Sequence, residues 1–281
     1  MQKSGWDARR RNRNMGTAKS GHGQDNRLTI PESWADNRRF YERLHNPVAL
    51  ARDINGHRLT FLIEATHADF CHACTPQDIE RVLELIPLDH LAPIRLIVLR
   101  QPKRKELILN PVWGRLQYWA DIGPYSGPAI HLEAQPVNAT YRWPKSLTPD
   151  QTLELKRLEQ EGHKIHSDRR YHHITSNFEA LRYTQLYRTT PHEIGHYVDY
   201  LESVTIPAGE DVVERQQLDN LYASKPTKDK EDFANRYATE FLTQQVQIGR
   251  LPFDRLLDPK QLKKSGLDPV WFSHLHAVDP L

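Results

Sequence analysis

The change of hydrophobic pattern near Thr148 is the sequence feature that most limits how this chain can fold. Before it lie short apolar or alternating runs separated by Pro and Gly, a pattern typical of β-strands. These runs are residues 58–65, 94–100, 105–110, 114–122 and 127–135. After it, four or five segments carry the apolar spacing of amphipathic helices. The order predicts an α+β fold, with residues 27–147 mainly sheet and residues 148–281 mainly helix.

A strand–helix–strand unit opens the predicted sheet. Residues 75–87 lie between the first two runs and begin with Thr75 as N-cap and Asp78 three positions later, which is a helix-start signature. A similar start at Thr148 predicts a charged helix as far as about Glu161. We therefore expect a parallel strand pair joined by a crossover helix.

Length and composition exclude several classes of protein. A chain of 281 residues buries about three quarters of the surface that its unfolded form exposes, so it needs no disulfide staples. No window approaches the roughly 18 apolar residues of a membrane span, and the first residues lack the apolar stretch of a signal peptide. Two cysteines allow one disulfide at most, which favours a reducing compartment. We expect a cytoplasmic protein without membrane contact; export by a non-Sec route as an effector and the oligomeric state stay open.

Residues 1–26 form a basic tail in which Lys and Arg lie among Gly, Ser, Asn and Gln, and we expect it to be disordered. Two interpretations are open: a solvated arm without a partner, or an electrostatic anchor to nucleic acid or an acidic partner. The net charge of +2 gives no reason to expect nucleic acid for the whole chain. The remaining residues, 27–281, are predicted to form a single domain.

The strongest motif is His-Glu-Ile-Gly-His at residues 192–196. On a helix, His192 and His196 lie about 40° apart, so both imidazoles can reach one metal ion, and Glu193 can take a proton from water on that ion. Because the chain has fifteen histidines, this motif would arise by chance at most roughly once in ten such sequences. The context supports it, since an apolar stripe lies opposite the two histidines. That stripe consists of Ile194, Tyr197, Val198 and Leu201.

The start of this helix has two interpretations. Thr190 and Pro191 fit an N-cap and first turn, in which case the Glu193 carboxylate would close a capping box instead of serving chemistry. Alternatively, Pro191 marks a kink in a helix that begins near Asn177.

A catalytic zinc ion takes three protein ligands and keeps one open position, so a third ligand is needed. Residues 228–253 carry a second apolar stripe that ends at Gly249, and Glu231 and Asn235 lie on it. A carboxylate on an apolar face is costly unless it is paired or bound to metal. We therefore predict Glu231 as the third ligand. The alternatives are a helix N-terminal acid stabilised by the helix dipole, and Glu240 as the ligand.

The two segments together resemble a known family. HEIGHYVD at residues 192–199, followed by EDFANRYA at residues 231–238, is similar to the gluzincin metallopeptidases, nearest the branch of lethal-factor-type toxins and Pro-Pro endopeptidases. Their signature is HExGHxxD with a later ExFAxxxA, and the match covers about a fifth of the chain. The resemblance implies a zincin-like domain that binds one Zn²⁺ through His192, His196 and Glu231 and hydrolyses peptide bonds in a peptide or protein substrate.

The resemblance also implies roles for further residues. Glu193 would act as general base and then general acid, and Asp199 would orient a metal ligand by hydrogen bonding. Asn235 stands where the family has an acid, which weakens any tuning by charge from that position. Tyr222 is best placed to stabilise the tetrahedral oxyanion. The alternatives for that role are Tyr200 and Tyr237.

Weaker patterns have competing interpretations. Residues 127–135 fit either the edge strand that borders a zincin cleft or a core strand, with His131 as an ordinary facing side chain. Cys71 and Cys74 form a CxxC pair that is part of a packed turn, half of a second zinc site or a redox pair. A histidine-rich stretch is predicted to be a polar loop. It contains His163, His166, His172 and His173.

Two functions other than catalysis fit the same sequence. One is a zincin-like module that binds metal without cleaving peptides. The other is a nucleic-acid-associated protein that uses residues 1–26.

Overall fold

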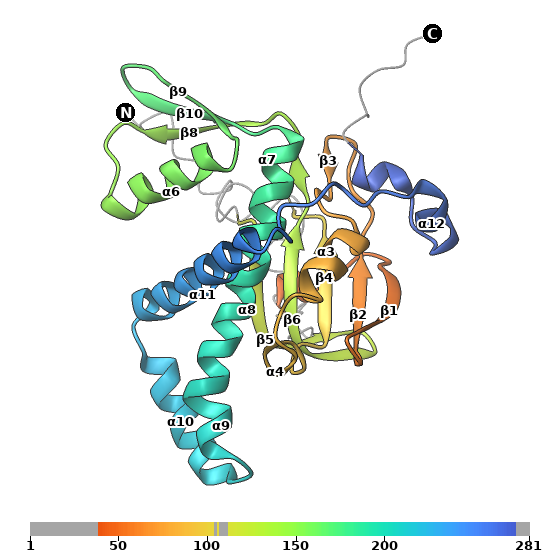
Figure 1. The fold of residues 1–281 in the computed structure, drawn as a ribbon, viewed down its shortest axis with the longest axis vertical. Coiled ribbons are helices and arrows are strands. Elements are labelled where there is room, and N and C mark those ends of the chain that lie inside the picture. Colours follow the sequence, from red (N-terminus) through yellow and green to blue (C-terminus); the bar gives the residue numbers. More distant parts are fainter. Residues whose placement is uncertain (1–38, 104–105, 107–111, 274–281) are drawn as a thin grey trace, which may run out of the picture. The chain divides into compact units, whose positions relative to one another are not determined.

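A mixed sheet forms the centre of the fold in the computed structural model, which describes residues 39–103, 106 and 112–273 (Figure 1). Among these residues, five strands lie in the order β1-β2-β4-β6-β5. They are β1 (Val48–Ile54), β2 (His57–Ile63), β4 (Leu96–Arg100), β5 (Gly114–Ile122) and β6 (Tyr125–Glu133). The three central strands are parallel, whereas β1 and β5 run antiparallel at the two edges. The sheet is therefore mixed, and β6, predicted as either edge or core, is a core strand.

The predicted crossover unit is present. The helix α3 (Pro76–Leu83) connects the parallel strands β2 and β4 and is followed by α4 (Leu88–Leu91). Thr75 and Asp78 form the expected capping box, in which each side chain accepts a hydrogen bond from the other residue's backbone N–H. This cap satisfies backbone donors at the helix start that would otherwise be unpaired.

The helices pack against one face of the central sheet. Alternate strand residues such as Phe61 and Ile97 join a large apolar core with side chains from α3, whereas Leu62 and Val98 join a smaller cluster on the other face. This alternation follows from the two-residue repeat of a β-strand. The result is the α+β class expected from the sequence.

A second sheet lies next to the helix α6 (Pro149–Gln160), whose predicted capping box at Thr148 is formed (Figure 1). Its strands are β8 (Thr140–Pro144), β9 (Lys164–Ser167) and β10 (Tyr171–Thr175), in the order β8-β10-β9. A two-stranded sheet pairs β3 (Phe70–Cys71) with β7 (Gln135–Pro136). The histidine-rich loop was a wrong prediction: three of its histidines lie in β9 and β10, and His163 is buried. The region after residue 148 is thus not purely helical.

A long helix with two π-helical segments follows. It comprises α7 (Phe178–Tyr183), η2 (Thr184–Thr189), α8 (Thr190–Tyr200), η3 (Leu201–Thr205) and α9 (Ile206–Ala208). It starts at the N-cap Asn177, so the interpretation that Thr190 starts a new helix is wrong. Pro191 has no N–H to donate, and η2, the π-helical turn before it, accommodates that loss. The Thr190 hydroxyl donates to the Gln185 carbonyl instead of capping a helix.

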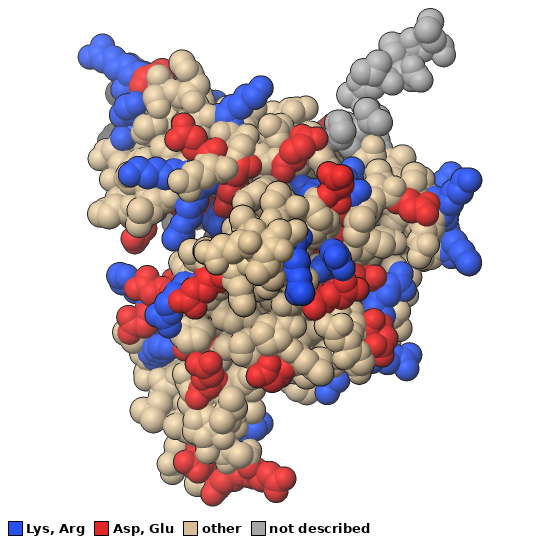
Figure 2. Space-filling model, viewed as in Figure 1, with Lys and Arg blue, Asp and Glu red and all other residues tan. Residues whose placement is uncertain are grey.

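Two further helices complete the site-bearing part of the molecule. These are α10 (Val212–Ser224) and the long α11 (Thr227–Gln247), which crosses α8 (Figure 1). Shorter elements are η1 (Phe40–Glu42), α12 (Pro259–Lys264) and η4 (Pro269–Phe272). Among the described residues, no helix is both long and apolar enough to cross a membrane. Figure 2 shows acidic and basic side chains interspersed over the viewed face. The basic tail, residues 1–26, and most of residues 105–110 lie outside the described part of the chain.

Candidate metal centre

Three side chains predicted as metal ligands meet at one point between α8 and α11. His192 Nε2 lies 3.4 Å from Glu231 Oε2, and His196 Nε2 lies 3.4 Å from Glu231 Oε1. One ligand atom from each of the three residues falls within 4.8 Å of the others. Among the described residues, no other group of three or more His, Cys, Asp or Glu side chains does so. The triad is therefore a possible metal site.

A glycine lets the two helices approach closely enough to form this triad. Gly195 sits between the two histidines, where an added Cβ would lie 3.0 Å from Tyr237 Cβ and 3.1 Å from Ala234 Cα. Both distances are tighter than ordinary van der Waals contact. Ala234 is itself fully buried at the crossing. Small residues on both helices thus bring Glu231, one turn before Ala234, next to the histidines.

The surroundings of Glu231 differ from those expected. Its side chain is 48 % exposed, so the burial cost used to predict it as a ligand does not apply. It lies at the edge of an open cleft rather than on the apolar stripe. Hydrogen bonds from His192 and His196 hold the pKa of its carboxyl well below the usual range, so it is ionised. Although burial opposes a charge on His196, its hydrogen bond to Glu231 raises the pKa of the imidazole above its ordinary value.

Glu193 is buried beside the triad and reaches toward the sheet. Its carboxylate accepts a hydrogen bond from the backbone N–H of Leu116 in β5, not from the start of its own helix. Burial raises the pKa of Glu193, and the neighbouring histidines reduce that effect only in part. The structure thus contains a carboxyl group with increased proton affinity next to the possible metal ligands.

An open cleft of about 920 Å³ contains these groups and is bordered by the strand β5. Gly114 allows β5 to pack closely against the end of η2 and against β6, since an added Cβ would lie 2.7 Å from the Thr189 side chain and 2.7 Å from the His131 carbonyl. The Trp113 carbonyl accepts a hydrogen bond from Glu133 N–H across the sheet. Antiparallel alternation then directs the backbone groups of Gly114 and Leu116 away from β6. Among the described residues no strand pairs with the outer side of β5, so β5 presents a free edge at the cleft.

Tyr222 and Asp199 are adjacent to the triad but bond to each other. The Tyr222 hydroxyl donates to Asp199 Oδ2 at 3.1 Å, and Lys225 Nζ lies 2.6 and 2.7 Å from the two Asp199 oxygens. Asp199 and Tyr222 are both buried. In the structure the Asp199 carboxylate thus accepts hydrogen bonds from Lys225 and Tyr222, whereas the sequence predicted that it orients a metal ligand. Burial raises the pKa of Tyr222 well above its ordinary value, so its hydroxyl keeps its proton.

Tyr118 of β5 was not singled out by the sequence. Its hydroxyl lies 3.0 Å from the Tyr222 hydroxyl, and its side chain lines the cleft together with His196 and Glu193. One pattern in the sequence could have indicated Tyr118. It lies two residues after Leu116 in the strand predicted at residues 114–122. Tyr200 bonds to Asp219, and Tyr237 bonds to His90, so both other candidate tyrosines have partners elsewhere.

The remaining predicted residues occupy separate places. Asn235 lines the cleft, where its Oδ1 accepts a hydrogen bond from Arg157 of α6. Glu240 is exposed on α11 and does not belong to the triad. His131 is fully buried and bonds to Gln117, as expected of a facing side chain in a core strand.

Cys71 and Cys74 are both free and buried, in a segment that packs into the core. Burial raises the pKa of the Cys71 thiol to about 12, and that of Cys74 further still. His72 is buried between them and bonds to the Glu64 carbonyl through Nε2. The segment fits the predicted packed turn.

Comparisons with protein-family models, with curated proteins and with solved structures find no match for this chain. The functional argument therefore rests on the residues and their geometry.

Proposed function

We propose that this protein is a zinc-dependent metallopeptidase of the gluzincin type with a zincin-like fold. The observation that carries the proposal is the placement of the His192, His196 and Glu231 ligand atoms next to the buried carboxyl of Glu193, in a cleft bordered by a free strand edge. Each part supplies something that peptide hydrolysis needs: a metal site, a base and a place for an extended chain.

The donor set fits zinc. Ligands at about 2.0–2.1 Å from a tetrahedral ion lie about 3.3–3.4 Å apart. The two imidazole-to-carboxylate distances of 3.4 Å are close to that spacing, each measured to a different oxygen of Glu231, and one ligand atom from each residue lies within 4.8 Å of the others. Two imidazoles and one carboxylate also form a known catalytic donor set, which leaves a fourth position open. His192, His196 and Glu231 would therefore hold the ion without rearrangement of the two helices.

Glu193 would carry the proton transfers. A bound zinc ion supplies Lewis acidity, which polarises the scissile carbonyl and lowers the pKa of a water molecule to about 7. The Glu193 carboxylate accepts the proton of the attacking water and then delivers it to the leaving amine. Its raised pKa favours proton uptake, and the hydrogen bond from Leu116 N–H fixes its orientation. Because that N–H belongs to the edge strand, the base is aligned with the strand that would hold the substrate.

Two groups of the cleft would bind the peptide. The backbone groups of Gly114, which point away from β6, can pair with an extended chain, as in recognition by strand addition. The Tyr118 hydroxyl lines the cleft and is held by Tyr222, which is in turn anchored to Asp199. We assign the oxyanion hydrogen bond to Tyr118, whose hydroxyl proton would turn from Tyr222 to the substrate, while Tyr222 positions the Tyr118 side chain.

The variant Glu193→Gln tests the proposal. It keeps the side-chain shape but removes the base, so kcat/KM on a peptide library should fall by about 10²–10⁴-fold while one zinc per chain remains bound. Activity and metal content are measured on the same preparations. The matched control is Glu202→Gln, an exposed glutamate on the continuation of the same helix, which should keep both.

Retention of full activity by Glu193→Gln would refute the assigned mechanism. Bound zinc without cleavage of any library peptide by the unmodified protein would favour the non-catalytic metal-binding module instead.

A further inference from the structure

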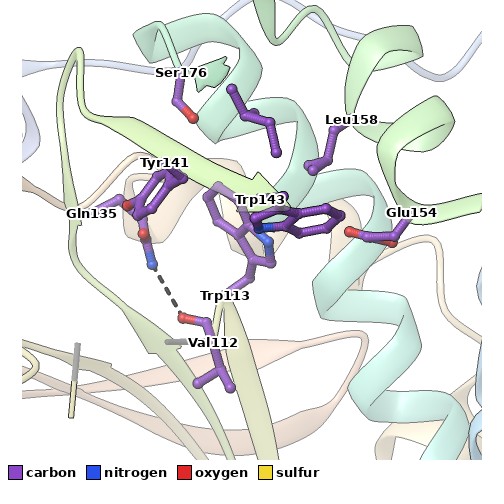
Figure 3. Close-up of a pocket in the computed structure, with 9 residues that line it drawn as sticks. Val112, Trp113, Gln135, Tyr141, Trp143, Glu154, Leu158 and Ser176 are labelled. Carbon is purple, nitrogen blue, oxygen red and sulfur yellow. Dashed lines mark hydrogen bonds between the residues drawn. The ribbon is translucent and has the colours of Figure 1, made fainter. Parts of the chain in front are cut away.

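A small hollow of about 110 Å³ adjoins the metal cleft (Figure 3). Four residues line both spaces, so the hollow continues from the cleft. They are Val112, Trp113, Trp143 and Glu154. The rest of its wall comes from the second sheet and the residue that follows it, from α6 and from Gln135 of β7. All of these lie outside residues 190–241, which carry the family resemblance.

The apolar residues that line the hollow share one face of their strands, because side chains alternate between the two faces of a β-strand. Tyr141 and Trp143 are two residues apart in β8 and share one face of the strand. In the register of the sheet, Ile174 of β10 lies directly opposite Tyr141 and so faces the same way. Leu158 and Glu154 are one turn apart on α6 and close the other side. The surface presented to the hollow is therefore mainly aromatic and aliphatic.

The side chains of Gln135, Ser176 and Glu154 in the wall bond to other parts of the protein. Ser176 Oγ lies 2.8 Å from His163 Nδ1, and Gln135 Nε2 donates to the carbonyls of Val112 and Glu133 at 3.2 Å. Glu154 forms an ion pair of 2.9 Å with Arg188. A polar ligand group would have to displace these partners, whereas an apolar group would not.

The hollow is held in shape by a buried histidine. The His163 ring packs against Trp113 with a centroid distance of 5.6 Å, and its Nε2 lies 2.9 Å from Thr184 Oγ1. The Trp113 carbonyl accepts a hydrogen bond of 2.9 Å from Gln185. These contacts fix Trp113 immediately before Gly114, the first residue of the free strand edge.

We propose that this hollow is the specificity pocket for one large apolar side chain, such as leucine or phenylalanine, of a peptide bound along β5. The inference rests on the proposed function, because it takes the cleft as the peptide site. An apolar cavity of about 150 Å³ holds a benzene ring, so about 110 Å³ with an opening to the cleft suits a branched aliphatic or single-ring side chain. The protein selects peptides with such a residue at one fixed position near the scissile bond.

Cleavage of internally quenched peptides tests the preference. Peptides that differ only in Leu, Phe, Ala, Asp or Lys at one position are compared by kcat/KM with the zinc-loaded full-length protein. We expect a preference for Leu or Phe over Ala of about 10-fold or more at one position. Leu158→Trp fills the hollow and should reduce that preference to about twofold or less. Trp143→Ala removes one wall from a half-buried position and serves as a second variant if Leu158→Trp does not fold.

Tyr171→Ala is the matched control, because Tyr171 lies on β10 and faces away from Ile174. It should retain the wild-type preference. Cleavage without any apolar preference, or a preference unchanged in both pocket variants, would overturn the pocket while leaving the peptidase proposal intact.

A binding measurement separates failure of the pocket from failure of the peptidase proposal. Ligand-observed NMR compares N-acetyl-leucine amide with N-acetyl-alanine amide on the wild-type and Leu158→Trp proteins. Binding of the leucine amide that is lost in Leu158→Trp supports the pocket even if no peptide is cleaved. Equal signals for both amides on both proteins would contradict it.

Discussion

Residues 71–74 and residues 192–196 both place metal-ligating side chains at spacings found in metal sites, yet their surroundings are opposite. His192 and His196 face an open cleft where α11 brings Glu231 to 3.4 Å from each ring. Cys71, His72 and Cys74 are sealed in the core, and among the described residues their ligand atoms do not converge to form a metal-binding group. A spacing in the sequence becomes a metal site only when a separate element delivers a ligand and the site stays open.

The pKa values of the candidate ligands also differ between the buried segment, residues 71–74, and the open cleft. A thiol must lose its proton to bind metal, and burial raises the pKa of Cys71 to about 12. In the cleft, Glu231 is already ionised because the two imidazoles hold the pKa of its carboxyl below the usual range. The cleft therefore favours the ligand form of Glu231, whereas the core opposes the ligand form of the thiols.

Removal of a cleft ligand is expected to have the largest effect. His196→Ala and Glu231→Gln should each lower zinc affinity by more than the 10–100-fold that loss of a supporting hydrogen-bond partner costs. Competition against a chelator of known affinity gives the measurement, with circular dichroism as a check on folding. Glu240→Gln, an exposed glutamate on the same helix as Glu231, is the control and should bind zinc normally. If the Glu231 variant bound zinc as tightly as the wild type, the triad would not be the metal site.

The pH dependence of the free energy of unfolding should show the effect of His72, the buried histidine in residues 71–74. Burial lowers the pKa of His72 to about 4, against about 6.5 in the unfolded chain. As pH falls from about 6.5 to about 4, the unfolded chain takes up a proton that the native protein does not. The free energy of unfolding should therefore decrease across that range, by about 3 kcal/mol from His72 alone, and should not change above about pH 7 on this account.

The variant His72→Gln isolates this contribution. The amide nitrogen can replace Nε2 as donor to the Glu64 carbonyl without titrating, so urea unfolding should show a shallower pH dependence. His163, whose pKa burial lowers to about 4, keeps its own contribution in both proteins. The difference between the two proteins should be the same with and without a chelator. A difference that depends on zinc would show that metal binds at His72. Residues 71–74 would then be a metal site like residues 192–196.

The sequence predicted those parts of the fold that depend on local rules. Capping boxes at Thr75 and Thr148, the crossover helix and the strand at residues 114–122 follow from side-chain patterns over a few residues. The second sheet was missed because β9 and β10 carry charged and histidine side chains and bury few of them. Its stability comes from contacts with distant segments, which no local pattern contains.

The same limit applies to the site. The positions of His192 and His196 follow from helical periodicity, but the approach of Glu231 depends on the packing of Gly195 against Ala234. The burial argument for Glu231 used the wrong environment, since the carboxylate is half exposed. The pairing of Tyr118 with Tyr222 joins residues that are 104 positions apart, so no sequence spacing could indicate it.

The double variant Cys71→Ala/Cys74→Ala should have the smallest effect on stability and none on zinc binding. It tests whether residues 71–74 are only a packed part of the core. Both side chains fill core space, so their truncation should cost about 1–2 kcal/mol in the free energy of unfolding, without loss of bound zinc. Urea unfolding and metal analysis of one preparation give both numbers. In the native wild-type protein, the raised pKa values of both thiols should make them react slowly with a disulfide reagent, and unfolding should restore ordinary reactivity. Loss of zinc from a folded double variant would show that the core segment binds metal after all, because no change has been made in the cleft.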